Sequence, residues 1–390
     1  ISMKKICLIS ICLSFFSVTL NAQEAFTNLQ DSLLKIKEAY APDLRVAIFE
    51  VAPTDSEGIV TIKGKTNLPI VQKAIQRLCD TNGCRNEVTL LPTADIGDAN
   101  YGIVNISTAF VRAAPHYESE LVTQTLLGTP IKVWEKKGTW FRIQTPDGYL
   151  GWLTETSFKR QNKRKQQEWL AKEKVIFTDF YGQTLTHPNK KSIPVSDIVA
   201  GCLLNKTRKV GSFYQVTYPD GRTAYIHSSQ CRLLATWIKT LPNKNIDIVN
   251  TAERFLGLPY LWGGTTTKAV DCSGLVKMVY YLHNIILPRD ASQQVKEGQK
   301  VEFSPTYKEL QLGDLLFFGP NEQRITHVGI YIGDKQFIHS SGTVHITSLD
   351  PLSPLYVERY VTRLQTVRRI VGHTTKGISS LTTNSFYTLQ

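Results

Sequence analysis

An internal repeat in the middle of the chain is the strongest constraint on its fold. The segment KGTWFRIQTPDGYLGWL at 137–153 matches VGSFYQVTYPDGRTAYI at 210–226 with a constant offset. In both copies apolar residues alternate on either side of Asp-Gly, a pattern typical of a β-hairpin because Asp-Gly readily supplies the positive φ of a tight turn. Two copies predict two small β-barrels, at 101–160 and 165–236, joined by a charged linker or helix.

The segment before the repeat has the pattern of a small α+β region covering 23–100. Apolar residues at positions 26, 29, 33, 36 and 40 recur at helical spacing, and they are followed by the strand-like RVAIFEV. A helix over about 69–78 and the strand-like EVTLLP complete the region. It contains no motif that carries chemistry, so the sequence assigns it no role.

The N-terminus has the pattern of an export signal. Lys4 and Lys5 precede the apolar run 6–20, and Leu20-Asn21-Ala22 resembles a small-residue cleavage site. The run is too short and wrongly flanked for a stable membrane anchor, and no later stretch reaches the length of a membrane span. We therefore expect 1–22 to be a signal peptide and the mature protein to be exported, to a periplasm or to the extracellular space.

Export changes how the cysteines are interpreted, because thiols tend to pair in an oxidising compartment. Five cysteines remain after residue 22. Cys79 and Cys84 flank the turn-rich Asp-Thr-Asn-Gly, and Cys202 and Cys231 fall within one small domain, so we expect two disulfides. Cys272 is left over, and a leftover cysteine in a secreted protein is a candidate reactive thiol.

The composition is that of a globular protein, with 42% hydrophobic and 20% charged residues among 390. Its formal net charge of +12 has two interpretations. One is a solvated surface that aids solubility, and the other is attraction to an anionic cell envelope or to acidic substrates. No basic run is interleaved with aromatic residues, so we expect no nucleic-acid partner.

The segment AVDCSGLVKMVYYL at 269–282 places a cysteine at the start of an amphipathic helix. Unpaired backbone N–H groups and the positive end of the helix dipole favour a thiolate at such a position. The alternative is a small buried hydrophobe, since free cysteine is among the most buried residues. The polar neighbours Asp271 and Ser273 argue against a wholly apolar pocket around Cys272.

Two histidines downstream are candidates for the base that a cysteine nucleophile needs. RITHVGIYIGD alternates as a strand, with His327, Gly329 and Tyr331 on one face, and His339 follows in KQFIHSSG. A three-residue loop centred on Gly333 would put the two histidines directly opposite each other. One imidazole would then take the thiol proton while the second group orients it. Zinc is disfavoured because the close ligand pairs of zinc sites are missing from the sequence.

The ordered motifs PYLWGG, DCSGLV, RDASQQ, GDLLFF, HVGIYIG and FIHSSG, spread over 240–372, resemble the NlpC/P60 family of papain-like cysteine peptidases of bacterial cell walls. The two barrels resemble bacterial SH3-like domains, and the whole arrangement is similar to the family's γ-D-glutamyl-L-diamino-acid endopeptidases (dipeptidyl-peptidase VI). The resemblance implies an α+β fold: a papain-like catalytic domain preceded by two SH3-like barrels and the small N-terminal region. It implies no cofactor. We expect a monomer and a loosely ordered polar tail at 373–390.

Carried onto matching positions, the resemblance implies the catalytic residues. Cys272 is expected to be the nucleophile, His327 the base and His339 the third, orienting residue. The hydroxyl of Tyr260 in PYLWGG, with the backbone N–H of the cysteine, is expected to stabilise the oxyanion. His345 is a weaker candidate because no motif surrounds it.

The resemblance also implies substrate-binding residues. Two of them, Asp271 and Ser273, are expected to line the site, although Asp271 is equally suited to cap the helix. Binding of a free amino terminus needs a carboxylate and a tyrosine hydroxyl or ring. The matching positions for that subsite are Asp290 and Ser292 in RDASQQ, Tyr149 in DGYLGW, and an acid in YESELVTQ, for which we choose Glu120 over Glu118.

These residues lead to one expected function and two alternatives. The leading expectation is an exported cysteine endopeptidase that cuts short wall peptides, L-Ala-γ-D-Glu-(L-Lys or diaminopimelate), after the D-Glu. The first alternative is another acyl-transfer enzyme on the same scaffold, an amidase or a transacylase. The second is a wall-binding protein whose catalytic domain is inactive.

Overall fold

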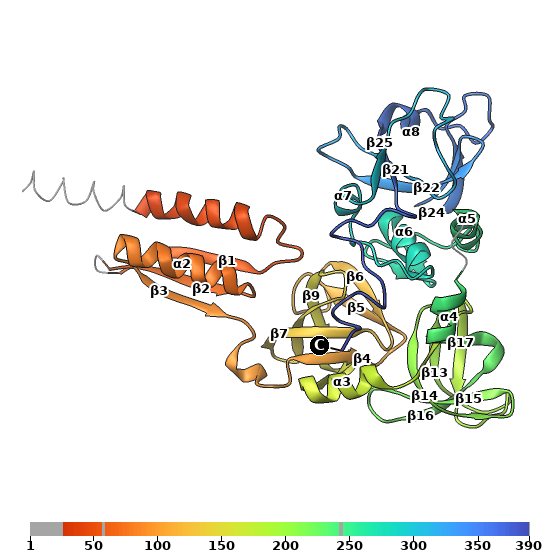
Figure 1. Ribbon diagram of the computed structural model, residues 1–390, viewed down its shortest axis with the longest axis horizontal. Helices are drawn as coiled ribbons and strands as arrows, with labels where there is room; N and C mark the ends of the chain where they lie inside the picture. Colours follow the sequence, from red (N-terminus) through yellow and green to blue (C-terminus); the bar gives the residue numbers. More distant parts are fainter. Residues whose placement is uncertain (1–25, 57–58, 242–244, 390) are drawn as a thin grey trace, which may run out of the picture. The chain divides into compact units, whose positions relative to one another are not determined.

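The computed structural model describes residues 26–56, 59–241 and 245–389 (Figure 1). The chain divides into two compact units, one ending at Gly97 and the other beginning at Asp98. The expected signal peptide at 1–22 lies outside the described residues. In the described part, no helix combines the length and apolar character needed to cross a membrane.

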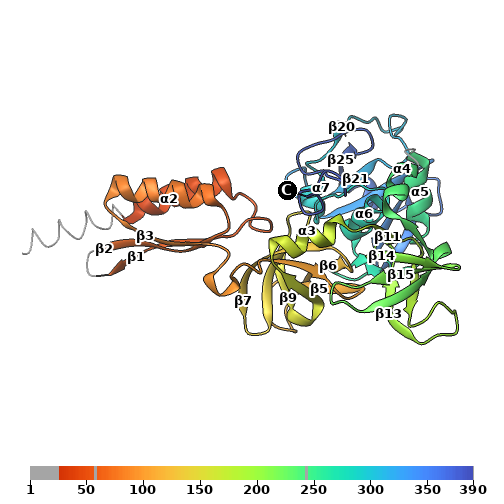
Figure 2. The same ribbon diagram turned by 60° about the horizontal axis from the view of Figure 1, so that its bottom comes forward.

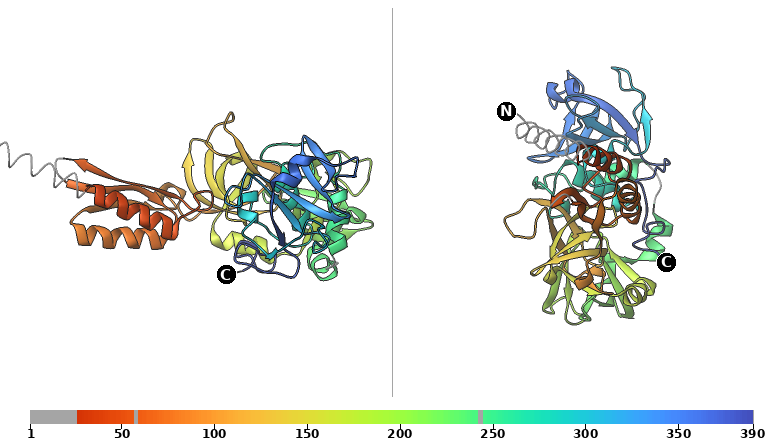
Figure 3. Two further views of the ribbon diagram at one scale, coloured as in Figure 1. Left: turned by 90° about the horizontal axis from the view of Figure 1, so that it is seen from above. Right: turned by 90° about the vertical axis from the view of Figure 1, so that its left-hand side faces the viewer.

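The N-terminal unit is a three-stranded sheet with its helices on one face (Figures 2 and 3). The first helix, 26–40, falls where the apolar spacing predicts it, and Leu29 and Leu33 are buried in the core. The predicted strand at 45–51 is displaced, because the Asp43 carboxylate accepts hydrogen bonds from Arg45 and holds 43–47 in a turn. The remaining elements, in chain order, are β1 (Phe49–Ser56), β2 (Ile59–Thr66), α2 (Pro69–Asn82), β3 (Arg85–Leu90) and η1 (Ala94–Ile96). In the sheet, β2 is antiparallel to β1 and parallel to β3.

The two copies of the repeat form two seven-stranded sheets with the same strand order, β10-β4-β7-β8-β9-β5-β6 and β17-β11-β14-β15-β16-β12-β13. Each strand of the first barrel therefore has a counterpart in the second. The first barrel comprises β4 (Tyr101–Val104), β5 (Thr108–Arg112), β6 (Leu121–Leu126), β7 (Pro130–Lys137), β8 (Trp140–Gln144), β9 (Leu150–Thr154), η2 (Glu155–Ser157) and β10 (Phe158–Gln161). The second comprises β11 (Lys174–Phe177), β12 (Tyr181–Leu185), β13 (Pro194–Val199), β14 (Leu203–Val210), β15 (Phe213–Thr217), β16 (Thr223–His227), η3 (Ser228–Gln230) and β17 (Cys231–Leu233). Between them, α3 (Lys163–Ala171) is the charged connector.

The expected disulfides are wrong for this structure, in which all five described cysteines are free thiols. Cys202 and Cys231 are kept apart by β11, since Phe177 pairs with Cys231 on one side and bonds to the carbonyl of Cys202 on the other. Cys79 and Cys84 lie on either side of a helix end. Burial, and then the hydrogen bond between the two thiols, raises the pKa of Cys79 to about 12.

The C-terminal part of the second unit is a six-stranded antiparallel sheet with α6 packed against it. The sheet order is β20-β25-β21-β22-β23-β24. Along the chain, the elements of this C-terminal part are α4 (Leu234–Thr240), α5 (Asn245–Glu253), β18 (Thr265–Thr266), β19 (Ala269–Val270), α6 (Cys272–Tyr281), α7 (Ala291–Gln294), β20 (Gln299–Val301), β21 (Leu315–Phe318), β22 (His327–Gly333), β23 (Gln336–Ser341), β24 (Thr343–Ser348), α8 (Glu358–Arg363) and β25 (Leu364–Arg369). Strands β18 and β19 pair with each other in a separate two-stranded sheet.

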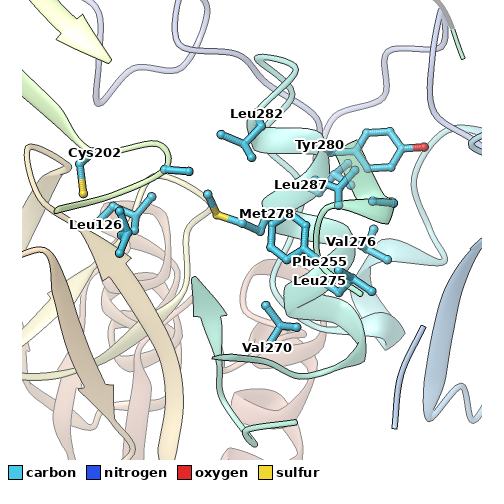
Figure 4. Packing of buried hydrophobic residues seen from close by; sticks show 14 of the residues in the cluster. Leu126, Cys202, Phe255, Val270, Leu275, Val276, Met278, Tyr280, Leu282 and Leu287 are labelled. Atoms are coloured by element: carbon cyan, nitrogen blue, oxygen red, sulfur yellow. The ribbon is translucent and has the colours of Figure 1, made fainter. Parts of the chain in front are cut away.

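Both barrels share one hydrophobic core with α6. Leu126 of the first barrel, Cys202 of the second and Met278 of α6 belong to the same buried cluster (Figure 4). The three parts meet at Gly201, whose φ is +88° and whose missing Cβ would lie 2.7 Å from the ring of Tyr281 and 2.9 Å from Leu126. Glycine is required there by both backbone conformation and space. The barrels are therefore packed directly against α6 and are not merely joined to it by a linker.

The Asp-Gly turns of the repeat serve as equivalent docking points. Asp147 of the first barrel accepts a hydrogen bond from Lys277 of α6 at 2.7 Å, and the carboxylate is almost completely buried. Asp220 of the second barrel accepts one from Asn105 of the first barrel at 2.9 Å. The Asp-Gly turn of each barrel thus contacts a neighbouring part of the unit, α6 for the first barrel and the first barrel for the second.

The polar tail is ordered against the rest of the unit, contrary to the sequence expectation. Ser379 pairs with Ile286 in an isolated bridge, and Asn384 donates to the carbonyl of Pro146 in the first barrel. Leu381 is buried with Ile176, Leu203, Trp237 and Ile286. Figure 1 shows this dark-blue segment running from the region of the six-stranded sheet back to the first barrel. The prediction rested on the Thr- and Ser-rich composition of the tail and overlooked the few apolar residues, such as Leu381, that pack against the rest of the unit.

We predict that Leu381→Ala lowers the free energy of unfolding by about 2 kcal/mol, because it leaves a cavity in a packed cluster. Leu389→Ala in the same tail is the matched control, since Leu389 is 60% exposed and its loss should change stability by less than about 0.5 kcal/mol. Urea unfolding monitored by near-UV circular dichroism compares the two. Equal, negligible effects would mean that the tail is not packed in solution.

Candidate active site

Cys272 is the first residue of α6, held there by a network around the helix cap. Asp271 is the N-cap, and its carboxylate accepts hydrogen bonds from the backbone N–H of Gly274 at 2.7 Å and of Gly263 at 2.9 Å. Gly274 must lack a side chain, because a Cβ there would lie 1.9 Å from the carbonyl oxygen of Gly264. The DCSG segment therefore fixes both the helix start and the PYLWGG loop beside it.

A buried arginine, Arg289, pairs with the N-cap residue Asp271. Arg289 is 2% exposed and pairs with both carboxylate oxygens of Asp271, while its guanidinium also donates to Ser273 Oγ at 2.8 Å. Its Nε donates to Thr123 Oγ1 of the first barrel at 3.1 Å. Burial lowers the pKa of Arg289, but the charge and hydrogen bond of Asp271 outweigh it and raise the pKa overall. Arg289 thus connects the start of α6 to the first barrel.

The two predicted histidines form a hydrogen-bonded chain. His327 Nε2 lies 2.8 Å from His339 Nδ1, and His339 Nε2 lies 2.9 Å from Thr347 Oγ1. This leaves Nδ1 of His327 for the thiol. The backbone N–H of Val328, the next residue of β22, hydrogen bonds to Cys272. The structure therefore brings the cysteine and both histidines together.

The histidines reach each other by a route that differs from the sequence prediction. The β22–β23 loop has two residues, Asp334 and Lys335, both with positive φ, and not three. A register shift between Tyr331 and Gly333 compensates, so Ile330 pairs with Ile338. The histidines consequently share a face and meet diagonally. Gly329 leaves room for them, since a Cβ there would lie 3.3 Å from Cβ of His339.

The electrostatics favour a neutral resting pair. Burial, and then the carboxylate of Asp271, raises the pKa of the Cys272 thiol to about 12. Burial, and then the charges of Arg359 and His345, lowers the pKa of His327 to about 4. The expected preference for a thiolate at the helix start is therefore outweighed by desolvation. A thiol beside a neutral imidazole can pass its proton only as the sulfur attacks.

Tyr260 lies close to Cys272. Burial raises the pKa of its phenol to about 12, and the negative charges of Cys272 and Asp271 in their ionised forms add to this effect. The hydroxyl therefore keeps its proton at neutral pH. A protonated phenol can donate a hydrogen bond to an oxyanion. The backbone N–H of Tyr260 donates to the carbonyl of Gly342, in the turn between β23 and β24, and so connects the PYLWGG loop to the sheet.

The predicted substrate-binding residues fall into separate groups. The hydroxyl of Tyr149 donates to Asp290 at 3.0 Å, so barrel and catalytic domain contact each other at this pair. Asp290 also lies 4.0 Å from Arg289. Glu120 is exposed and accepts a hydrogen bond from Nε1 of Trp262 in PYLWGG. Ser292, in contrast, lines a separate hollow of about 230 Å³ with Lys296 and Lys300 among others.

Sequence reasoning missed three residues of the site. Arg289 directly precedes Asp290 in the quoted RDASQQ, but a lone arginine gives no sign of being buried. Thr347, which ends the histidine chain, stands in a strand without any motif. The ring of Tyr360, from α8, lies 5.6 Å from the ring of His327 and 4.8 Å from that of His339, and only the tertiary fold brings it there.

The described residues include no cluster of three or more His, Cys, Asp or Glu side chains that could hold a metal ion. The side chains at this site are a thiol, two imidazoles, a phenol and two carboxylates. Such a set suits acyl transfer through a cysteine nucleophile.

Comparisons with known proteins agree with this arrangement. Residues 257–366 match the NlpC/P60 family, and 111–158 match the bacterial dipeptidyl-peptidase Sh3 domain. A γ-D-glutamyl-L-lysine dipeptidyl-peptidase of Bacillus cereus is 32% identical over 62% of this chain and 74% of its own length. Dipeptidyl-peptidase 6 of Lysinibacillus sphaericus is 27% identical over 68% of this chain and 97% of its own.

A solved structure has the same fold. The crystal structure of an NlpC/P60 family protein from Bacillus cereus covers 70% of this chain and 99% of its own, with 25% identity and a TM-score of 0.59.

We predict that Arg289→Lys lowers kcat/KM at least about tenfold and the free energy of unfolding by about 3 kcal/mol, because lysine cannot make the bidentate pair that keeps Asp271 compensated. Arg142→Lys, which alters an ion pair with Glu135 inside the first barrel, is the matched control and should keep its activity. Steady-state kinetics and urea unfolding measure both. Unchanged turnover in Arg289→Lys would remove this pair from the catalytic architecture.

We also predict that kcat/KM holds its plateau down to about pH 5. The lowered pKa of His327 keeps the imidazole neutral, and so able to accept the thiol proton, well below the ordinary value of about 6.5. The acid limb of the pH–rate profile should fall towards pH 4. A half-maximal point between pH 6 and 7 would show that His327 is not desolvated as described.

Proposed function

Because the chain belongs to the NlpC/P60 family of cysteine peptidases, we propose that it cuts short cell-wall peptides L-Ala-γ-D-Glu-(L-Lys or diaminopimelate) after the D-Glu. The relatives named above as γ-D-glutamyl-L-lysine dipeptidyl-peptidase and dipeptidyl-peptidase 6 support this substrate class. The pattern at 1–22 supports an exported protein that meets such peptides in a periplasm or outside the cell.

The observation that carries the proposal is the contact between Tyr149 and Asp290. A barrel residue and a catalytic-domain carboxylate meet at 3.0 Å, next to Arg289, which pairs with the N-cap residue Asp271 of the nucleophile's helix. A carboxylate with a phenolic hydroxyl suits an ammonium group. We assign this pair, together with Glu120, which directly precedes β6 of the same barrel, to the free amino terminus of L-Ala. The barrel would then exclude longer, N-terminally extended strands.

The reaction follows from the roles of the four catalytic groups. The thiol of Cys272 gives its proton to Nδ1 of His327 as sulfur attacks the γ-carbonyl carbon of D-Glu. The hydroxyl of Tyr260 and the backbone N–H of Cys272 stabilise the oxyanion. His339, braced by Thr347, keeps the ring of His327 oriented.

The tetrahedral intermediate then collapses. His327 gives its proton to the leaving amine of the diamino acid, the C–N bond breaks, and a thioester remains on Cys272. A water molecule, deprotonated by His327, attacks the thioester. L-Ala-γ-D-Glu leaves as the free acid, and the proton returns to the thiolate.

The test is digestion of L-Ala-γ-D-Glu-L-Lys beside its N-acetylated form, with products identified by mass spectrometry. We expect Lys to be released from the free peptide, with at least about a hundredfold lower kcat/KM for the acetylated one, since acetylation removes the charge that Asp290 would bind. Cys272→Ala is the control and should stay folded but inactive.

Each other outcome has a definite meaning. Equal cleavage of both peptides would keep the peptidase and remove Asp290, Tyr149 and Glu120 from specificity. Transfer of the acyl group to an added amine in preference to water would favour a transacylase. Cleavage of neither peptide by the folded protein would favour a wall-binding protein.

A further inference from the structure

Arg359 of α8 stands beside the catalytic histidines without an acidic partner. Its guanidinium carbon lies 4.8 Å from the ring centre of Tyr360, and Nη2 donates to the Tyr360 hydroxyl at 3.0 Å. That same ring packs against both His327 and His339. The arginine is thus positioned by a residue that covers the histidine chain.

The charge of Arg359 is not neutralised within the described ranges 26–56, 59–241 and 245–389, where it makes no ion pair. The side chain is exposed, so its remaining N–H groups can reach a ligand. An uncompensated cation beside a base is unfavourable for that base, because it opposes protonation of His327 in the transition state. A bound anion would relieve this cost.

The position of Arg359 indicates which part of the substrate supplies the anion. The acyl half is proposed to lie towards Asp290 and Tyr149, on the side of the first barrel. α8 lies at the end of the catalytic domain away from that barrel (Figure 1). The leaving residue must occupy the side of Cys272 opposite the acyl half, next to the imidazole that protonates its amine. In a tripeptide this residue carries the free α-carboxylate of the chain.

We propose that Arg359 binds the α-carboxylate of the leaving diamino acid and selects peptides that end at that residue. The proposal rests on the proposed function, because it needs the substrate orientation given there. A guanidinium suits a carboxylate through two parallel N–H donors. Together with the amine subsite, it would make the enzyme recognise both ends of a short peptide.

The test compares wild type and Arg359→Gln on three peptides. The first is L-Ala-γ-D-Glu-L-Lys, the second carries an amide at the Lys α-carboxylate, and the third carries an amide at the D-Glu α-carboxylate. We expect Arg359→Gln to lower kcat/KM about tenfold for the first and third peptides and to change the second by less than about twofold. Comparing peptides within one variant cancels any change in the histidines.

Arg363→Gln is the matched control, since Arg363 is exposed on the same helix and should keep the wild-type ratios. Equal losses on all three peptides would overturn the proposal and mean that Arg359 acts only through the histidines. A loss that disappears with the D-Glu amide would overturn it in favour of the other carboxylate. If wild type cleaves none of the three peptides, the proposed function fails and the carboxylate subsite fails with it. If wild type cleaves all three and Arg359→Gln leaves every kcat/KM unchanged, only the carboxylate subsite is rejected.

Discussion

The buried pair of Arg289 and Asp271 is the interaction on which the rest of the site depends. Two charges removed from water are costly unless their geometry and their remaining hydrogen bonds are satisfied. Here the carboxylate also accepts from Gly263 and Gly274, and the guanidinium also donates to Ser273 and Thr123. The pair therefore fixes the start of α6, the PYLWGG loop and the edge of the first barrel in a single arrangement. It gives the nucleophile a defined position more than it gives the fold stability.

The two copies of the repeat show how the first barrel becomes part of the site. Both barrels present an Asp-Gly turn, and each turn docks on the part that lies next to it. The residue after the turn differs: in the second copy Arg222 pairs with its own Asp220, whereas in the first copy Tyr149 contacts Asp290. In one barrel the residue after the turn therefore binds within its own hairpin, and in the other it contacts the C-terminal domain. The shared core around Gly201 and the packed tail hold this contact in place.

The sequence was sufficient where the pattern is local. The hairpin repeat and the cysteine at a helix start both follow from spacing. It failed where the outcome depends on distant contacts. A two-residue loop alone would put His327 and His339 on opposite faces of the sheet, and the register shift between Tyr331 and Gly333 puts them on the same face. Burial raises the pKa of the Cys272 thiol by more than the helix dipole lowers it. Leu381 finds its partners only in the folded unit, and the strand β11 that separates Cys202 from Cys231 is not adjacent to either in sequence.

The most direct test of the account is to trap the acyl-enzyme. Acid-quenching the enzyme within its first turnovers on L-Ala-γ-D-Glu-L-Lys, followed by peptide mapping, should find an L-Ala-γ-D-Glu thioester on Cys272. Turnover without any adduct on this cysteine, or an adduct on another residue, would contradict the assignment of Cys272 as the nucleophile.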